Sequence, residues 1–340
     1  MNPPVFVVST GRCGSNLVSE FLRSHPRVLS LNDVLTNTRP YTFAFNPVDG
    51  QRLWWMLNRP YLPSVIMARH GLWVEEFLYP RRPGMRFRAE EGIPGILLGT
   101  LPHLTEDPDT LHDELRAFVL ALPEDALGTQ LRRVFGWLRD RFGKEVWVER
   151  SGGSLGPVPS ILEHFPEARF IHLYRDGREC AMSMSRHHVY RLGFGIPELA
   201  RAFGFRADSS AGTAGDDPDA VDRLPEQVAF DAEAYRQREV APELFGELWS
   251  GWILEGLDNL ARVAPGRVFN LCYESLLQSP RPELERLGHF ILPGGAQEEW
   301  VAACAARVNT KPPSWRALPE PARARLEASC RPGLERLGYL

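Results

Sequence analysis

The sequence predicts a three-layer α/β fold, in which a parallel sheet lies between helices on both of its faces. Two observations predict it. Short runs of apolar, often β-branched residues recur along the 340-residue chain, and such runs are typical of strands buried on both faces. Segments of helical periodicity separate these runs. Strands that alternate with helices indicate a parallel sheet.

The N-terminal residues contain the first predicted strand, turn and helix. The run at 5–8 (VFVV) predicts a buried strand, and a glycine-bearing turn at 9–15 follows it. Apolar residues then recur at helical spacing until Pro26, which we expect to end the helix. This order is half of a β–α–β unit.

The same alternation returns in the second half of the chain. We predict strands over 146–148, 170–174 and 268–272, and helices over 157–165, 177–187 and 244–264. The C-terminal residues 281–340 are predicted to be helical with proline breaks.

Two segments depart from the alternation. Residues 36–130 are rich in Pro, Trp and Arg and show mixed helical periodicity, so we expect a helical insertion there. Residues 207–226 are small, acidic and contain glycine and proline, which is typical of a mobile loop. We expect the whole chain, residues 1–340, to form a single domain that carries both segments.

Composition and charge exclude several classes of protein. The formal net charge of −4 argues against a general nucleic-acid-binding protein, which usually has a basic face. The five cysteines are odd in number and form no CxxC pair, so neither a disulfide framework nor a zinc knuckle is expected. Reduced thiols, an N-terminus without a signal-peptide pattern and the lack of an apolar stretch of about 18 residues predict a cytoplasmic protein without a membrane span.

The turn after the first strand has the features of an anion-binding loop. It reads Ser-Thr-Gly-Arg-Cys-Gly-Ser-Asn over residues 9–16. A glycine turn between a strand and a helix N-terminus presents backbone N–H groups to an anion. Arg12 favours this interpretation over a ligand-free tight turn, because a cation there would otherwise be repelled by the positive end of the helix dipole. The loop lacks the Gly-Lys pair of the Walker A motif and is not GxGxxG, which disfavours ATP hydrolysis and dinucleotide binding.

A second anion-binding motif is expected after the strand at 170–174. Arg175 stands at the carboxyl end of that strand, where parallel sheets bind ligands, and Ser183 follows eight residues later on the next helix. Arginine suits a bidentate contact with phosphate. The alternative interpretation is a surface pair of Arg175 with Asp176 and an ordinary helix serine.

The two motifs, in this order and on these elements, resemble the nucleotide-binding motifs of sulfotransferases that use 3′-phosphoadenosine-5′-phosphosulfate (PAPS), a family with bacterial members and a P-loop-like fold. In that family the first loop binds the 5′-phosphosulfate and the second motif binds the 3′-phosphate. The resemblance implies in-line transfer of a sulfuryl group from PAPS to a hydroxyl or amine acceptor, with adenosine 3′,5′-bisphosphate (PAP) as the product. No metal is expected, because no Mg²⁺ ligand set accompanies the loop.

The resemblance also implies which residues bind the donor. In the loop, Arg12 falls at the cationic position, Ser15 at the first hydroxyl position, and Asn16 where the second hydroxyl residue usually lies. The loop residues expected to contact the donor are Gly11, Arg12, Cys13, Gly14, Ser15 and Asn16. Arg175 and Ser183 are expected to hold its 3′-phosphate.

Two weaker matches extend the resemblance toward the C-terminus. Tyr273 begins a Tyr-Glu-x-Leu segment, in which the family places the tyrosine near the adenine; an ordinary core role is the alternative. Lys311 lies in the region of the family's C-terminal loop that closes over the nucleotide, although the glycine usual in that loop is missing here.

Transfer to a hydroxyl requires a base near the acceptor, because a neutral hydroxyl is a poor nucleophile. Many bacterial members carry a glutamate after the first helix, in a segment that this chain matches as Ser-His-Pro-Arg-Val-Leu-Ser-Leu-Asn-Asp, and Asp33 takes the glutamate position. In a parallel sheet this position would lie at the same edge as the Gly11 loop. Asp33 and Arg12 are therefore the expected catalytic residues. The alternative role for Asp33 is to cap the next turn, and His70 and His103 are the alternative bases, since cytosolic relatives use histidine.

No readable motif identifies the acceptor. We expect a small-molecule or carrier-bound acceptor, which the insertion at 36–130 would bind. Two alternative functions remain open: a kinase with a degenerate P-loop, and a nucleotide-binding module without catalytic activity.

Overall fold

The chain forms two compact units in a computed structural model that describes residues 2–195, 230–310 and 312–340. Unit 1 comprises Met1–Leu31, Phe135–Ser185 and Ala241–Leu340, and unit 2 comprises Asn32–Val134 and Arg186–Val240. The loop predicted over 207–226 lies outside the described residues.

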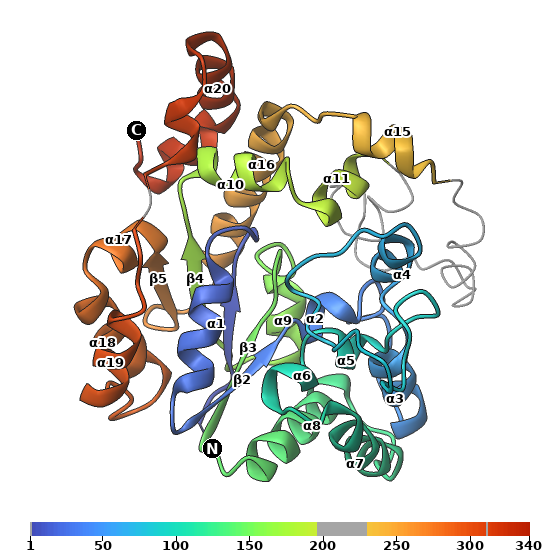
Figure 1. Cartoon of the computed structure of the whole chain (residues 1–340). Helices are drawn as coiled ribbons and strands as arrows, with labels where there is room; N and C mark the ends of the chain where they lie inside the picture. The colour runs from blue at the N-terminus through green and yellow to red at the C-terminus, as the bar shows by residue number, and fades with distance from the viewer. Residues whose placement is uncertain (1, 196–229, 311) are drawn as a thin grey trace. The chain divides into compact units, whose positions relative to one another are not determined.

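Unit 1 is built on a five-stranded sheet with the strand order β2-β3-β1-β4-β5 (Figure 1). The strands are β1 (Val5–Val8), β2 (Val28–Asn32), β3 (Val146–Arg150), β4 (Arg169–Tyr174) and β5 (Val268–Cys272). Parallel pairing joins β3 to β1, β1 to β4, and β4 to β5. The non-sequential order requires helical crossovers between parallel strands, which confirms the predicted α/β class.

Four of these strands lie where the sequence predicts them, and β2 is the one that the apolar pattern does not predict. All five of its residues are buried, including the polar Ser30 and Asn32. These two residues interrupt the apolar run that usually marks a strand buried on both faces. The Ser30 hydroxyl is satisfied by donating to the backbone oxygen of Ser19 at 3.5 Å.

Helices flank the sheet of unit 1 (Figure 1). They are α1 (Ser15–Ser24), α9 (Val158–His164), α10 (Gly177–Met184), α16 (Pro242–Leu260), α17 (Tyr273–Gln278), α18 (Pro280–Ile291), α19 (Glu298–Ala305) and α20 (Glu320–Leu337), with a short 3₁₀ helix η1 (Ser314–Ala317). Several begin with proline in the first turn, where the missing N–H costs no hydrogen bond.

Trp249 of α16 fixes the position of α10, the helix that carries Ser183. Its side chain is fully buried. A Cβ at Gly177 of α10 would lie 2.3 Å from the Trp249 ring, and one at Gly333 of α20 would lie 2.5 Å from it. Only glycine therefore allows these two helices to approach the indole so closely.

The regular elements described in unit 2 are helices, joined by turns and irregular segments. Its helices are α2 (Val34–Asn37), α3 (Gly50–Asn58), α4 (Leu62–Arg69), α5 (Gly95–Leu98), α6 (Leu101–Leu104), α7 (Pro108–Leu120), α11 (His188–Gly195) and α15 (Ala232–Gln237), and α8 (Leu127–Arg141) runs from unit 2 into unit 1. Within the described ranges, no helix is both long and apolar enough to cross a membrane.

His172 on β4 is expected to make stability depend on pH. Its Nδ1 lies 3.0 Å from the side-chain oxygen of Asn270, which can only accept, so Nδ1 carries the proton of a neutral ring. Burial lowers the pKa of His172 to about 4. The unfolded chain takes up a proton near pH 6.5, so stability is lost as the pH falls from about 6.5 toward about 4.

Because of this histidine, we expect the free energy of unfolding to fall by about 2 kcal/mol when the pH is lowered from about 7.5 to about 5. Urea unfolding of the wild type and of His172→Gln at both pH values measures this change in the free energy of unfolding. The variant should lose this part of the pH dependence, and an identical pH dependence in both proteins would contradict the assignment.

Candidate anion-binding site

The loop between β1 and α1 has the backbone of an anion-binding turn. Gly11, Arg12 and Gly14 have positive φ angles of 80°, 54° and 88°. Gly14 is the N-cap residue of α1 and provides no side-chain cap, so the first turn of the helix begins without one. The N–H groups of such a turn, together with the helix dipole, attract an anion.

The Arg12 side chain connects this loop to the second predicted motif. Its Nε donates to the hydroxyl of Ser183 at 3.1 Å, across 171 residues of sequence. The thiol of Cys180, on the same helix as Ser183, lies 3.8 Å from the backbone oxygen of Arg12. The two motifs that the sequence predicts separately therefore meet in unit 1.

Arg175 and Tyr273 complete the same cluster. Arg175 directly follows β4, and its guanidinium carbon lies 4.7 Å from the centre of the Tyr273 ring. That ring in turn covers the loop, because a Cβ at Gly14 would lie only 2.1 Å from Tyr273 Cε2. Burial raises the pKa of the Tyr273 hydroxyl, so it is neutral at physiological pH. The cluster thus presents two arginines, one serine, one aromatic ring and a glycine loop.

Glu274 is a residue of this site that the sequence analysis misses. One carboxylate oxygen accepts the backbone N–H of Asp176 at 3.0 Å, which fixes the turn directly after Arg175. The other accepts the hydroxyl of Tyr339 at 2.7 Å. Its position next to Tyr273 in the Tyr-Glu-x-Leu segment is the one local signal that points to it.

The remaining loop residues differ in exposure. Cys13 is fully buried, and burial raises the pKa of its thiol, so it remains protonated. Ser15 is buried at the start of α1, whereas Asn16 is exposed. Lys311 lies outside the described residues. Within the described ranges, no group of three or more His, Cys, Asp or Glu side chains is arranged to hold a metal ion.

Asp33 belongs to unit 2, where it directly follows β2 and precedes α2. Its residue is 7% exposed, and its side chain makes no capping hydrogen bond to α2. By position Asp33 is nevertheless the N-cap residue of α2, and its backbone oxygen accepts the N–H of Asn37 at 3.0 Å. Of the alternative bases in unit 2, His103 is buried in α6, and His70 ends α4 against the ring of Phe230, 4.7 Å between ring centres.

Backbone strain coincides with the two residues that the sequence predicts to be catalytic. Within the described ranges, the non-glycine residues with positive φ are Arg12 at 54° and Asp33 at 57°. A non-glycine residue in this conformation costs roughly 1–3 kcal/mol, and such residues cluster at functional sites. Arg12 and Asp33 therefore remain candidates for a functional role.

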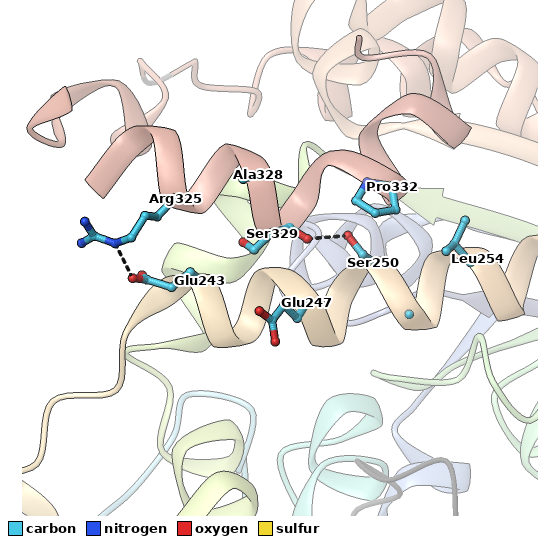
Figure 2. Close-up of a pocket in the computed structure, with 9 residues that line it drawn as sticks. Glu243, Glu247, Ser250, Leu254, Arg325, Ala328, Ser329 and Pro332 are labelled. Carbon is cyan, nitrogen blue, oxygen red and sulfur yellow. Dashed lines mark hydrogen bonds and ion pairs between the residues drawn. The ribbon is translucent and has the colours of Figure 1, made fainter. Parts of the chain in front are cut away.

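A cavity of about 640 Å³ between α16 and α20 does not suit the same ligand (Figure 2). Glu243 and Glu247 line it, and its arginine, Arg325, is already bonded to Glu243 at 3.0 Å. None of the predicted donor-binding residues that the structure describes lines this cavity. Because its acidic lining would repel a phosphorylated nucleotide, the Gly11 loop is the better candidate for an anion site.

Comparison with known proteins identifies the fold. No protein-family model matches the chain, and no curated protein matches it. Among solved structures, the chain is similar to a sulfotransferase domain from the curacin biosynthetic pathway, with a TM-score of 0.51 and 16% identity over 100% of this chain and 99% of that one. It is also similar to the sulfotransferase domain of the Synechococcus PCC 7002 olefin synthase, with a TM-score of 0.52 and 16% identity over 100% and 95%. The chain therefore has the fold of these sulfotransferase domains.

Proposed function

We propose that the protein transfers a sulfuryl group from PAPS to a hydroxyl or amine acceptor. The main support for the proposal is the hydrogen bond of Arg12 to Ser183. It joins the predicted 5′-phosphosulfate loop to the predicted 3′-phosphate motif. A donor with phosphate groups at both the 3′ and the 5′ position requires two such anion sites close together. The fold shared with sulfotransferase domains supports the same conclusion.

In this proposal each residue of the cluster has a chemical role. Arg175 and Ser183 hold the 3′-phosphate, Tyr273 lies along the adenine, and Lys311 contacts the nucleotide. Arg12 and the loop N–H groups stabilise the negative charge that develops on the phosphate as the sulfuryl group leaves. The bond from sulfur to the donor phosphate oxygen breaks while a bond from sulfur to the acceptor forms, and Asp33 takes the acceptor proton. The acceptor is a small molecule or a carrier-bound group.

Binding of PAP is expected to be at least about tenfold tighter than binding of 5′-AMP, which lacks the 3′-phosphate. The reason is the charge-assisted contact of Arg175, since a hydrogen bond to a charged group contributes about 1.5–3 kcal/mol. Calorimetry with both nucleotides tests the proposal, and Arg175→Ala should reduce the difference. Equal affinity of the wild type for the two nucleotides would exclude the proposed donor.

Alanine at Gly14 is expected to weaken PAP binding by at least about tenfold. Its Cβ would clash with the Tyr273 ring, and its φ of 88° is unfavourable for any residue with a Cβ. The matched control is Gly251→Ala in α16, where a Cβ meets nothing within 4 Å. The control should bind PAP normally; normal binding by Gly14→Ala would mean that the loop need not keep this geometry.

A further inference from the structure

Glu179 on α10 contacts both the predicted 3′-phosphate site and the C-terminal region. It lies four residues after Arg175, and its side chain is 11% exposed. One oxygen, Oε2, lies 3.2 Å from Nη2 of Arg175. The other, Oε1, accepts the hydroxyl of Ser314 and the backbone N–H of Trp315, each at 3.0 Å. Both carboxylate oxygens are thus engaged, by two different parts of unit 1.

The first contact restricts the guanidinium of Arg175. An arginine side chain has many rotamers. A contact that requires one of them costs conformational entropy, because the other rotamers are lost. Glu179 and the Tyr273 ring hold the group before a ligand arrives. Arg175 is 25% exposed in this pair, so the contact is less screened by water than an ordinary surface ion pair. A guanidinium has five N–H donors, which allows it to bind the carboxylate and a phosphate together.

The second contact fixes the segment η1, which begins three residues after Lys311. The Trp315 ring lies 3.9 Å from the guanidinium carbon of Arg178 on α10. Arg178 is itself held by Asp176 and Glu327, each at 2.8 Å. Glu179 and Arg178 therefore attach η1 to the helix that follows Arg175.

We propose that Glu179 is a positioning residue for the 3′-phosphate of the donor. One of its oxygens orients the guanidinium of Arg175, and the other holds the carboxylate in place through Ser314 and Trp315 of η1. The orientation of Arg175 therefore depends on the attachment of η1. Glu179 does not itself bind the phosphate, because both groups are anions. This inference rests on the proposed function, in which Arg175 binds the 3′-phosphate.

The test compares two neutral replacements of similar shape, Glu179→Gln and Glu179→Met. Both remove the negative charge, so both relieve the repulsion of a bound phosphate equally. Glutamine keeps an oxygen that accepts hydrogen bonds, whereas methionine has only a weakly accepting sulfur. Glu179→Ala serves as a second variant of the same kind if Glu179→Met does not fold. Calorimetry then gives the affinity of each protein for PAP and for 5′-AMP, and the measured quantity is the ratio of the two affinities.

We expect Glu179→Gln to keep the preference for PAP of at least about tenfold and Glu179→Met to reduce it to about threefold or less, with 5′-AMP affinity unchanged. A wild-type ratio in Glu179→Met overturns the inference. An equal loss of affinity for PAP and for 5′-AMP in Glu179→Met also overturns the inference, because a merely structural role predicts that result. Arg175→Ala separates the two claims. If the wild type prefers PAP and Arg175→Ala removes the preference, the proposed function stands and only the role of Glu179 is in question. If the wild type shows no preference, both claims fail.

Discussion

Asparagine in place of Asp33 is expected to lower sulfuryl transfer by at least about a hundredfold and to leave nucleotide binding unchanged. General base catalysis contributes about 10²–10⁴ to a rate. Asparagine keeps the shape of aspartate and one accepting oxygen but cannot take the acceptor proton. Asp33 is the N-cap residue of α2, where its side chain makes no capping bond and its backbone has a φ of 57°.

The measurement is the rate of PAP formation from PAPS with an acceptor found in a panel screen, beside calorimetry with PAP. Asp33→Glu should retain part of the activity, since it keeps the carboxylate. His70→Gln and His103→Gln are the matched controls and should transfer at the wild-type rate. If Asp33→Asn kept the wild-type rate at neutral pH, one of these histidines would be the base instead.

Alanine in place of Arg12 is expected to lower turnover by about 10²–10³, with a smaller effect on donor affinity. This is the usual cost of removing one donor from a site that stabilises developing charge. In the proposed role, the N–H groups of the Arg12 guanidinium, whose Nε is held by Ser183, contact the transferring group. The charge they meet is greatest when the bond from sulfur to phosphate oxygen breaks.

Steady-state kinetics with varied PAPS separates the two roles of Arg12. Arg12→Lys keeps the positive charge and should retain more turnover than Arg12→Ala. It loses the planar guanidinium, which can donate two parallel hydrogen bonds to one anion. Both variants carry the same backbone strain as the wild type, because each keeps a Cβ at a φ of 54°. A normal kcat with only a raised KM for PAPS would make Arg12 a binding residue and not a catalytic one.

The sequence predicts the parts of the fold and the site that local patterns encode. Strand β1, its glycine loop and helix α1 follow directly from an apolar run, two glycines and helical periodicity. Arg175 and Ser183 can be proposed from the sequence because each stands at a fixed place after a strand. Strand β2 is missed because Ser30 and Asn32 interrupt its apolar run.

The supporting carboxylates are missed for a different physical reason. Glu179 and Glu274 act on residues that are far away in the chain: Glu179 bonds to Ser314 across 135 residues, and Glu274 bonds to Tyr339 across 65. Local periodicity in the sequence cannot predict contacts between residues so far apart in the chain. The spacing of four residues between Arg175 and Glu179 is the exception, because it matches an ion pair on one helix face.

We expect the protein to move a sulfuryl group from PAPS to a hydroxyl or amine acceptor. The most direct test incubates the wild type with PAPS and a panel of acceptors, without added divalent metal, and measures released PAP and sulfonated product together. We expect equal amounts of PAP and sulfonated product, and no phosphorylated product from ATP with Mg²⁺. Phosphoryl transfer from ATP that depends on Mg²⁺ would instead indicate a kinase. Tight binding of PAP with no sulfonated product from any acceptor would contradict catalysis and indicate a nucleotide-binding module.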